Sequence, residues 1–186
     1  MSVSLLLGLV YLISELLLTA TRRSRSRNGT KQDRSTLRVV WLVIMVSVVA
    51  GIYVAKHWSV AALPHHPTFV VAGVVLFVAG LLLRWWAIIT LGRFFTVDVT
   101  IEKDHQLVER GPFRMVRHPS YTGVLLAFVG LALTLDNWAA LLVILLPISA
   151  AFIHRMNVEE NALSDALGSQ YTDYMRRTKR LVPFVY

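Results

Sequence analysis

Cysteine is absent from this chain of 186 residues, and charged residues make up only 16% of it. Without cysteine there is no disulfide framework, no thiolate metal site and no cysteine nucleophile, and the redox compartment stays undetermined. Acidic residues are scarcer than basic ones, 11 against 19, which gives a net charge of +8. Hydrophobic residues fill 55% of the chain, and the mean hydropathy of +0.58 is well above that of soluble proteins. The composition predicts an integral membrane protein of one compact domain.

The apolar residues are gathered into five runs that polar segments separate. The last two runs are shorter than the about 20 residues that a straight transmembrane helix needs, and only Asp136 and Asn137 separate them. We therefore expect a helical hairpin, about residues 120–158, whose polar ends complete the two helices. The sequence predicts an all-α integral membrane fold with about five transmembrane helices. Their apolar centres lie at residues 3–19, 39–55, 68–83, 124–135 and 138–153.

The basic residues indicate how these helices are oriented. The first apolar run precedes its basic flank, whereas a signal peptide has its basic flank first, so we interpret the run as an uncleaved span. Every Lys and Arg except Lys56 and Arg84 falls in residues 22–38, in the loop 92–121 or in the tail from Arg155 onward. Because basic loops stay in the cytoplasm, this predicts an N-terminus outside and a cytoplasmic central loop and C-terminus. Membrane topology thus explains the positive charge without nucleic-acid binding.

For the polar residues in or beside the first three spans, we favour structural roles over functional ones. Arg84, followed by two tryptophans, is typical of an anchor at the membrane interface, where indole rings prefer the headgroup depth. Glu15 is either a residue near the cytoplasmic end of its span or an inward-facing functional carboxylate, and the cost of burying an acid favours the first. His65 and His66 supply too few ligands for a metal site, so we predict none.

Residues 105–123, HQLVERGPFRMVRHPSYTG, form a polar and basic segment between two spans. Its two prolines disfavour a helical conformation in the residue before each, so the backbone must break here. The freed backbone groups and the side chains together suit a polar, charged small molecule with a planar part. A topology signal that contacts lipid headgroups is the alternative interpretation. The side chains concerned are His105, Phe113, Arg114, Arg117, His118 and Tyr121.

The C-terminal tail holds a second group of polar residues. Arg155 and Glu159 are four residues apart and so lie on one helix face. Gly168 is expected to end this helix, and Tyr171 to begin a short further one. Glu160 either assists its neighbour or faces the cytosol. An amphipathic surface helix with a solvated ion pair, which adds little stability, is the alternative interpretation.

The motifs occur in a fixed order within about residues 90–184. The series is HQLV, GPF and RHPSYTG, then Arg155 with Glu159 and Glu160, then LGSQYTDY and Arg180 before Pro183. This series resembles the isoprenylcysteine carboxyl methyltransferase family, and the short chain is similar to its prokaryotic type. The resemblance implies transmembrane helices capped by a cytoplasmic cofactor site, formed by the loop before the fourth span and the C-terminal tail. It divides the chain into N-terminal transmembrane helices, 1–91, with a basic loop at 21–38, and a catalytic region, 92–186.

The same resemblance implies S-adenosylmethionine entering from the cytosol and a lipid-bearing acceptor entering from the bilayer. Glu159 matches an acidic residue on the cofactor, and Arg155 matches an arginine linked to the acceptor. Phe113 stands where members often have tyrosine, so the stacking surface is kept without the hydroxyl. Residue chemistry agrees, because Glu159 suits the positive end of the cofactor, and His118 or Arg117 its carboxylate. The other cofactor contacts that the resemblance implies are His105, Gln106, Leu107, Val108, Pro119, Ser120 and Tyr121.

The expected reaction is methyl transfer from S-adenosylmethionine to the carboxylate of an isoprenylcysteine or a similar molecule. A membrane methyltransferase acting on a phospholipid amine, a quinone-like compound or a thiol would share the cofactor motifs. Membrane sterol and isoprenoid reductases that use NADPH have a similar His-Pro-x-Tyr arrangement, and a polybasic scaffold binding anionic lipid is the non-enzymatic alternative. The double glutamate and the ordered motifs favour a methyltransferase. The sequence leaves the oligomeric state open.

Overall fold

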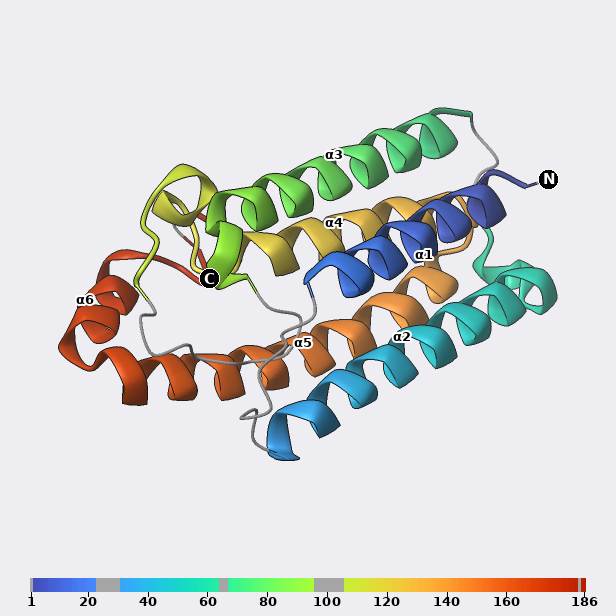
Figure 1. Ribbon diagram of the computed structural model, residues 1–186. Coiled ribbons are helices and arrows are strands. Elements are labelled where there is room, and N and C mark those ends of the chain that lie inside the picture. Colours follow the sequence, from blue (N-terminus) through green and yellow to red (C-terminus); the bar gives the residue numbers. More distant parts are fainter. Residues whose placement is uncertain (1, 23–30, 64–66, 96–105, 184) are drawn as a thin grey trace.

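The computed structural model describes residues 2–22, 31–63, 67–95, 106–183 and 185–186, and no β-sheet forms among them. The five longest helices run side by side, and each runs opposite to the one before it (Figure 1). A shorter helix, α6, lies at one end of this bundle. The helices are α1 (Val3–Arg22), α2 (Lys31–His57), α3 (Pro67–Leu91), α4 (Pro119–Leu133), α5 (Trp138–Leu167) and α6 (Ser169–Arg177), with 3-10 turns η1 (Ser59–Ala61), η2 (Gly92–Phe94) and η3 (Gly111–Arg114).

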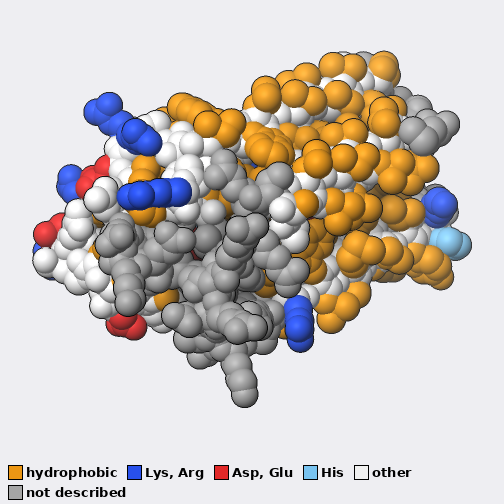
Figure 2. Space-filling model, in the orientation of Figure 1, with side chains coloured by type: hydrophobic (Ala, Val, Ile, Leu, Met, Phe, Trp, Pro, Cys, Tyr) orange, Lys and Arg blue, Asp and Glu red, His pale blue; other side chains and the backbone are white. Residues whose placement is uncertain are grey.

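The outer surface of the bundle is apolar over most of its length. Hydrophobic side chains cover the body of the molecule in Figure 2, while most visible charged side chains gather at the end that carries α6. Among the described residues, four helices are long and apolar enough to cross a membrane, namely α1, α2, α3 and α5. The apolar helix α4 has only 15 residues, or about 22 Å at 1.5 Å per residue. The all-α membrane fold is confirmed, and a fifth span made by α4 stays a prediction.

The two termini lie at opposite ends of the bundle. The N-terminus begins α1 at the end away from α6, and the C-terminus lies at the end of the bundle that carries α6 (Figure 1). The orientation across the membrane, with the α6 end in the cytoplasm, stays a prediction. The division of the chain between residues 91 and 92 also stays a prediction.

The hydrophobic core lies along the middle of the bundle. Phe77 from α3 and Phe128 from α4 meet Ile144 and Ile148 from α5, and each of these side chains is buried. The helix α2 joins them through Ile44. Burying such side chains inside the bundle leaves the outward faces of the same helices for lipid.

Helices α3 and α4 are in direct backbone contact. A Cβ atom built on Gly80 would lie 2.5 Å from the carbonyl oxygen of Gly123, and one built on Gly123 would lie 2.7 Å from the backbone nitrogen of Arg84. Two turns away, a Cβ on Gly73 would lie 2.7 Å from the carbonyl oxygen of Gly130. No side chain fits at these positions, so the glycines let the two backbones approach as small residues do between membrane helices.

The turn between α4 and α5 is fixed to the segment after α2. Asn137 is the N-cap of α5, where its side-chain oxygen accepts from the backbone N–H of Ala140 at 2.9 Å and its amide donates to the carbonyl of Trp58 at 2.9 Å. Capping in this way satisfies a backbone donor that the first helical turn leaves free. The predicted hairpin is present, and α5 continues past Arg155 to Leu167.

At the other end of the hairpin, the chain after α6 returns to the segment before α4. The backbone N–H of Arg117 donates to the carbonyl of Lys179 at 2.7 Å, and that of His118 donates to the carbonyl of Arg180 at 3.0 Å. Gly168, with φ 57°, ends α5 as predicted, because this conformation suits glycine. Helix α6 begins at the next residue, two positions earlier than predicted.

Candidate functional site

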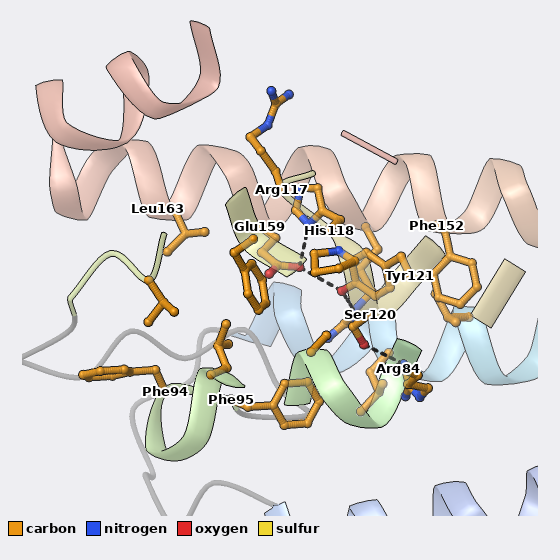
Figure 3. A pocket seen from close by; sticks show the side chains of 18 of the residues that line it. Arg84, Phe94, Phe95, Arg117, His118, Ser120, Tyr121, Phe152, Glu159 and Leu163 are labelled. Carbon is orange, nitrogen blue, oxygen red and sulfur yellow. Dashed lines mark hydrogen bonds and ion pairs between the residues drawn. The ribbon is translucent and has the colours of Figure 1, made fainter. Parts of the chain in front are cut away.

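A cavity of about 170 Å³ lies at the end of the bundle that carries α6. Its walls come from all six helices and from the segments around η2 and η3. The segment before α4 and the helix α5 contribute polar side chains, among them Arg117, His118 and Glu159, whereas α2 contributes the apolar side chains of Val40 and Ile44. Figure 3 shows side chains from these walls converging. A mixed lining of this kind suits an amphipathic ligand.

The residues that the resemblance assigned to the site meet at this cavity. Arg155 and Glu159 reach it from α5, and the rest come from the segment before α4 and its first turn. His105 lies outside the described residues. The structure therefore brings the predicted residues together, while their roles stay predictions. The remaining lining residues from that prediction are Gln106, Leu107, Val108, Phe113, His118, Pro119, Ser120 and Tyr121.

Tyr121 connects the arginine and the glutamate that the sequence placed on one helix face. Its hydroxyl donates to Glu159 Oε2 at 2.8 Å (Figure 3). The same hydroxyl accepts from Arg155 Nε at 3.1 Å. The Arg155 side chain also donates to Thr36 Oγ1 of α2 at 3.3 Å. The His118 ring lies beside this chain, with Nδ1 4.0 Å from Glu159 Oε2. Glu159, Tyr121 and Arg155 therefore form a hydrogen-bonded row of cavity-lining side chains that runs from a carboxylate to a guanidinium.

Glu160 lies beside the cavity wall and holds three basic residues together. It accepts from Arg117 Nε at 2.9 Å, from His118 Nε2 at 3.0 Å and from Arg180 Nη2 at 2.6 Å. Because a carboxylate only accepts, His118 carries a proton on Nε2. Arg117 donates as well to backbone carbonyls at the end of α6. These four residues, the Glu160 cluster, join α5, the segment before α4 and the C-terminal tail.

One of the two sequence interpretations of Glu160 is wrong. The residue is buried, with 5% of its surface exposed, so it does not face the cytosol. That it assists Glu159 stays a prediction, since Glu160 bonds one ring nitrogen of His118 and the other ring nitrogen lies 4.0 Å from Glu159 Oε2. Consecutive helical residues point about 100° apart, so two adjacent acids must serve different surroundings. This helical geometry was the signal in the sequence that could have separated the surroundings of the two glutamates. Arg117 belongs to the same cluster and also lines the cavity, so its suggested role as a donor to the cofactor stays a prediction.

The interpretation of Arg84 as an interfacial anchor is wrong. Arg84 is buried in α3 and donates to both oxygens of Glu15 in α1, from Nε at 2.6 Å and from Nη2 at 2.8 Å. Its remaining amino group donates to Ser120 Oγ at 2.9 Å. Beside this pair, Trp85 Nε1 donates to Ser14 Oγ at 3.0 Å. Glu15 is thus an inward-facing carboxylate. Its burial is possible because its charge is neutralised by an arginine 69 residues away.

Two tyrosines of α6 complete the polar end. Tyr171 and Tyr174 are buried and line the cavity, and Tyr174 donates to the backbone carbonyl of Phe113 at 2.6 Å. Burial, and then the nearby carboxylates Glu159 and Glu160, raises the pKa of Tyr171, and burial raises that of Tyr174. Both phenols are therefore neutral at physiological pH. They give the cavity aromatic surface without adding charge.

Comparison with protein families and curated proteins gives matches over most of the chain. Residues 68–170 match the family model described as phospholipid methyltransferase. Protein-S-isoprenylcysteine O-methyltransferase A of Arabidopsis thaliana is 31% identical, over 97% of this chain and 92% of the plant protein. Protein-S-isoprenylcysteine O-methyltransferase B of the same plant is 34% identical, over 77% of this chain and 73% of its own length.

A solved structure also resembles this bundle. It is that of the eukaryotic intramembrane Ras methyltransferase ICMT, isoprenylcysteine carboxyl methyltransferase, with a TM-score of 0.63 and 26% sequence identity. The similarity covers 78% of this chain and 52% of the eukaryotic chain, so this chain spans about half the length of that protein.

Proposed function

The chain belongs to the isoprenylcysteine O-methyltransferase family, and from this we propose that it transfers a methyl group from S-adenosylmethionine to the carboxylate of a lipid-bearing acceptor such as an isoprenylcysteine. A methyltransferase needs a methyl donor and an acceptor in one cavity. The observation that carries the proposal is the row Arg155, Tyr121 and Glu159, whose acidic and cationic ends face the same cavity.

The residues at the acidic end fit the donor. Glu159 is partly exposed, with 29% of its side chain accessible, and only its Oε2 is engaged by the described residues. Its second oxygen is thus available to an ammonium or sulfonium group. Leu107, Val108 and Phe113 line the same cavity and offer an apolar surface for an adenine ring. Glu159 would bind the positively charged end of the methyl donor, and the three apolar residues would contact its adenine ring.

The residues at the cationic end fit an anionic acceptor with a lipid chain. Arg155 lies 4% exposed at the cavity, and its planar fork matches a carboxylate. Beyond it the cavity is lined by Tyr11 from α1 and by Val40 and Ile44 from α2, which suit an apolar chain. This arrangement supports an acceptor that enters from the bilayer with its carboxylate toward Arg155.

The chemistry needs positioning more than proton transfer. When bound, S-adenosylmethionine supplies a methyl group on a sulfonium, and its transfer to a carboxylate forms an ester and leaves a neutral thioether. A carboxylate acceptor is already anionic at neutral pH, so the cavity needs no general base. Arg155 would orient the acceptor, and the apolar walls would exclude water, which is where an enzyme gains rate in such a displacement.

A phospholipid amine is the second candidate acceptor, because the matching family model is that of phospholipid methyltransferases. Transfer to a protonated amine would first require loss of a proton, and the cavity faces that acceptor with a guanidinium, Arg155. Like charges repel, and most strongly where protein rather than water surrounds them. The geometry therefore favours the carboxylate.

Calorimetric titration with S-adenosylhomocysteine tests the donor half. The detergent-purified protein should bind it, and NADPH should not bind. Glu159→Gln should weaken binding about tenfold or more, since a charge-assisted hydrogen bond contributes about 1.5–3 kcal/mol. Asp165→Asn, an exposed acid on the same helix, is the matched control and should change nothing. Folded wild-type protein that does not bind S-adenosylhomocysteine would refute the proposal.

A methylation assay tests the acceptor half. A farnesylated cysteine analogue should accept the methyl group, and phosphatidylethanolamine should not. Arg155→Ala should leave the affinity for S-adenosylhomocysteine within about twofold and lower turnover of the farnesylated analogue at least about tenfold, because it removes the group that orients the acceptor. If Arg155→Ala and Glu159→Gln lost cofactor affinity equally, the two residues would not have separate roles.

A further inference from the structure

A buried ion pair joins two membrane helices next to the cavity. Glu15 of α1 is 6% exposed and Arg84 of α3 is 9% exposed, and both line the cavity. Charges buried between membrane helices are costly unless they are paired. A buried pair is also weak support for stability, because apolar residues of similar size often do as well. Stability alone therefore does not explain the pair, and a role that apolar side chains could not fill is more consistent with it.

The guanidinium of Arg84 has a second partner besides Glu15. Its Nε and Nη2 donate to Glu15. Its Nη1 donates to Ser120 Oγ at 2.9 Å (Figure 3). Ser120 belongs to the first turn of α4, directly before Tyr121, which bonds Glu159. The fork of Arg84 thus reaches from α1 to the proposed donor site.

The backbone contact between α3 and α4 sets this reach. A Cβ atom on Gly123 would lie 2.7 Å from the backbone nitrogen of Arg84 and 3.0 Å from its Cβ. Gly123 is three residues after Ser120, so both lie on one face of α4. The close approach at Gly123 is what brings the Ser120 hydroxyl within hydrogen-bond distance of Arg84.

The hydroxyl oxygen of Ser120 accepts a hydrogen bond from Arg84. No acceptor for the proton of this hydroxyl is found within the described parts of the chain. Ser120 lines the cavity. A hydroxyl that accepts from a cation becomes a stronger donor, because linked hydrogen bonds polarise one another. A carboxylate in the cavity is the partner that such a donor prefers.

We propose that Glu15 and Arg84 are a positioning pair: Glu15 holds Arg84, and Arg84 holds Ser120 so that its hydroxyl donates to the carboxylate of the methyl donor. The inference rests on the proposed function of the cavity. It makes α1 part of the donor site, although α1 carries none of the residues that the resemblance assigned to that site. Neither residue of the pair touches the reacting atoms.

A double-mutant cycle on S-adenosylhomocysteine affinity tests the pair. Arg84→Lys keeps the charge but loses the fork, so a single ammonium no longer orients both Glu15 and Ser120. We expect Arg84→Lys and Ser120→Ala each to weaken binding about three- to tenfold, as for one hydrogen bond. The double variant should be no weaker than either single one, because both changes remove the same contact. Glu15→Gln should give a loss of the same size.

Ser14→Ala is the matched control, since it removes a neighbouring hydrogen bond between α1 and α3, that of Ser14 with Trp85, without touching Ser120. It should lower the thermal stability and leave the affinity unchanged. If Glu15→Gln does not fold, Ser120→Ala with Arg84→Lys still completes the cycle.

The outcomes separate the two proposals. Wild-type protein that binds S-adenosylhomocysteine, with Arg84→Lys of equal affinity, would overturn the positioning pair alone. Fully additive losses, or an equal loss of affinity in Ser14→Ala, would also overturn it, because they indicate a general effect of α1 packing. Folded wild-type protein that binds no S-adenosylhomocysteine would remove the proposed function and this inference with it.

Discussion

Replacing Glu160 with glutamine keeps the size of the side chain and removes its charge. The Glu160 carboxylate accepts three charge-assisted hydrogen bonds, from Arg117, His118 and Arg180. Glutamine offers one acceptor oxygen, and its amino group would face donors that it cannot satisfy. The change therefore removes most of the cluster while leaving the cavity wall in shape.

The size of the effect follows from the burial of the partners. The side chains of Glu160, Arg117 and His118 are 6%, 10% and 3% exposed, and that of Arg180 is 25% exposed. Hydrogen bonds to charged groups contribute about 1.5–3 kcal/mol each, and the loss of one partner from a buried pair costs about 3–5 kcal/mol. With about two such bonds lost, Glu160→Gln should destabilise the protein by about 3–5 kcal/mol.

Thermal unfolding in detergent, followed by tryptophan fluorescence, measures this loss. For a chain of this length, about 3–5 kcal/mol corresponds to a fall in Tm of about 6–20 °C. Limited trypsin digestion adds a local measure, because Lys179 and Arg180 are cleavage sites whose carbonyls bond the segment before α4. Cleavage there should become faster in Glu160→Gln.

The neighbouring acid supplies the control. Glu159→Gln removes a charge from a side chain that is 29% exposed and keeps an oxygen that can accept from Tyr121, so its cost should stay below about 1 kcal/mol. If both glutamine variants shared one Tm and one rate of tail cleavage, Glu160 would not hold the tail and the reasoning from burial would be refuted.

Three further results are expected. Gly123→Ala should lower Tm strongly, because its Cβ would lie 2.5 Å from a backbone carbonyl, whereas Gly8→Ala, which meets nothing within 4 Å, should not. Asn137→Ala should cost about 1–2 kcal/mol by removing the cap of α5, measured by thermal unfolding against the exposed Asn161→Ala. Burial raises the pKa of Tyr171 above its ordinary 10.0, so this residue supports stability below about pH 10 and the support is lost at higher pH. Tyr171→Phe should therefore lose less Tm between pH 9 and pH 11 than the wild type, and an equal loss would contradict the effect of burial.

Much of the architecture could be predicted because it depends on local patterns. Apolar runs predicted the helices, Gly168 predicted the end of α5, and the helical spacing of Arg155 and Glu159 predicted that both lie on one helix face. Their place at one site came from the family resemblance, and both line the cavity. Five apolar runs predicted the membrane fold, and among the described residues four helices are long and apolar enough to cross a membrane. Tyr121 was assigned to the same site by the family resemblance, and it lines the cavity from the first turn of α4.

What the sequence could not show depends on contacts between distant residues. Arg84 looked interfacial because two tryptophans follow it, yet its partner Glu15 is 69 residues earlier and no local pattern links them. Glu160 looked ambiguous for the same reason, since Arg117 lies 43 residues before it and Arg180 lies 20 residues after it. The pairing of buried charges depends on tertiary packing, which local patterns in a sequence do not show.

The glycine contact between α3 and α4 also limits where the protein can move. Packed helices usually shift past one another through small rotations of the side chains between them. Between Gly80 and Gly123 there are no such side chains, and carbonyl oxygens meet the opposing backbone. This pair of helices therefore acts as a stiff frame that carries Ser120. Any opening that admits a ligand must hinge on the helices around the frame, and labels that report distance should record motion in α1, α2 or α6 against a constant α3–α4 spacing.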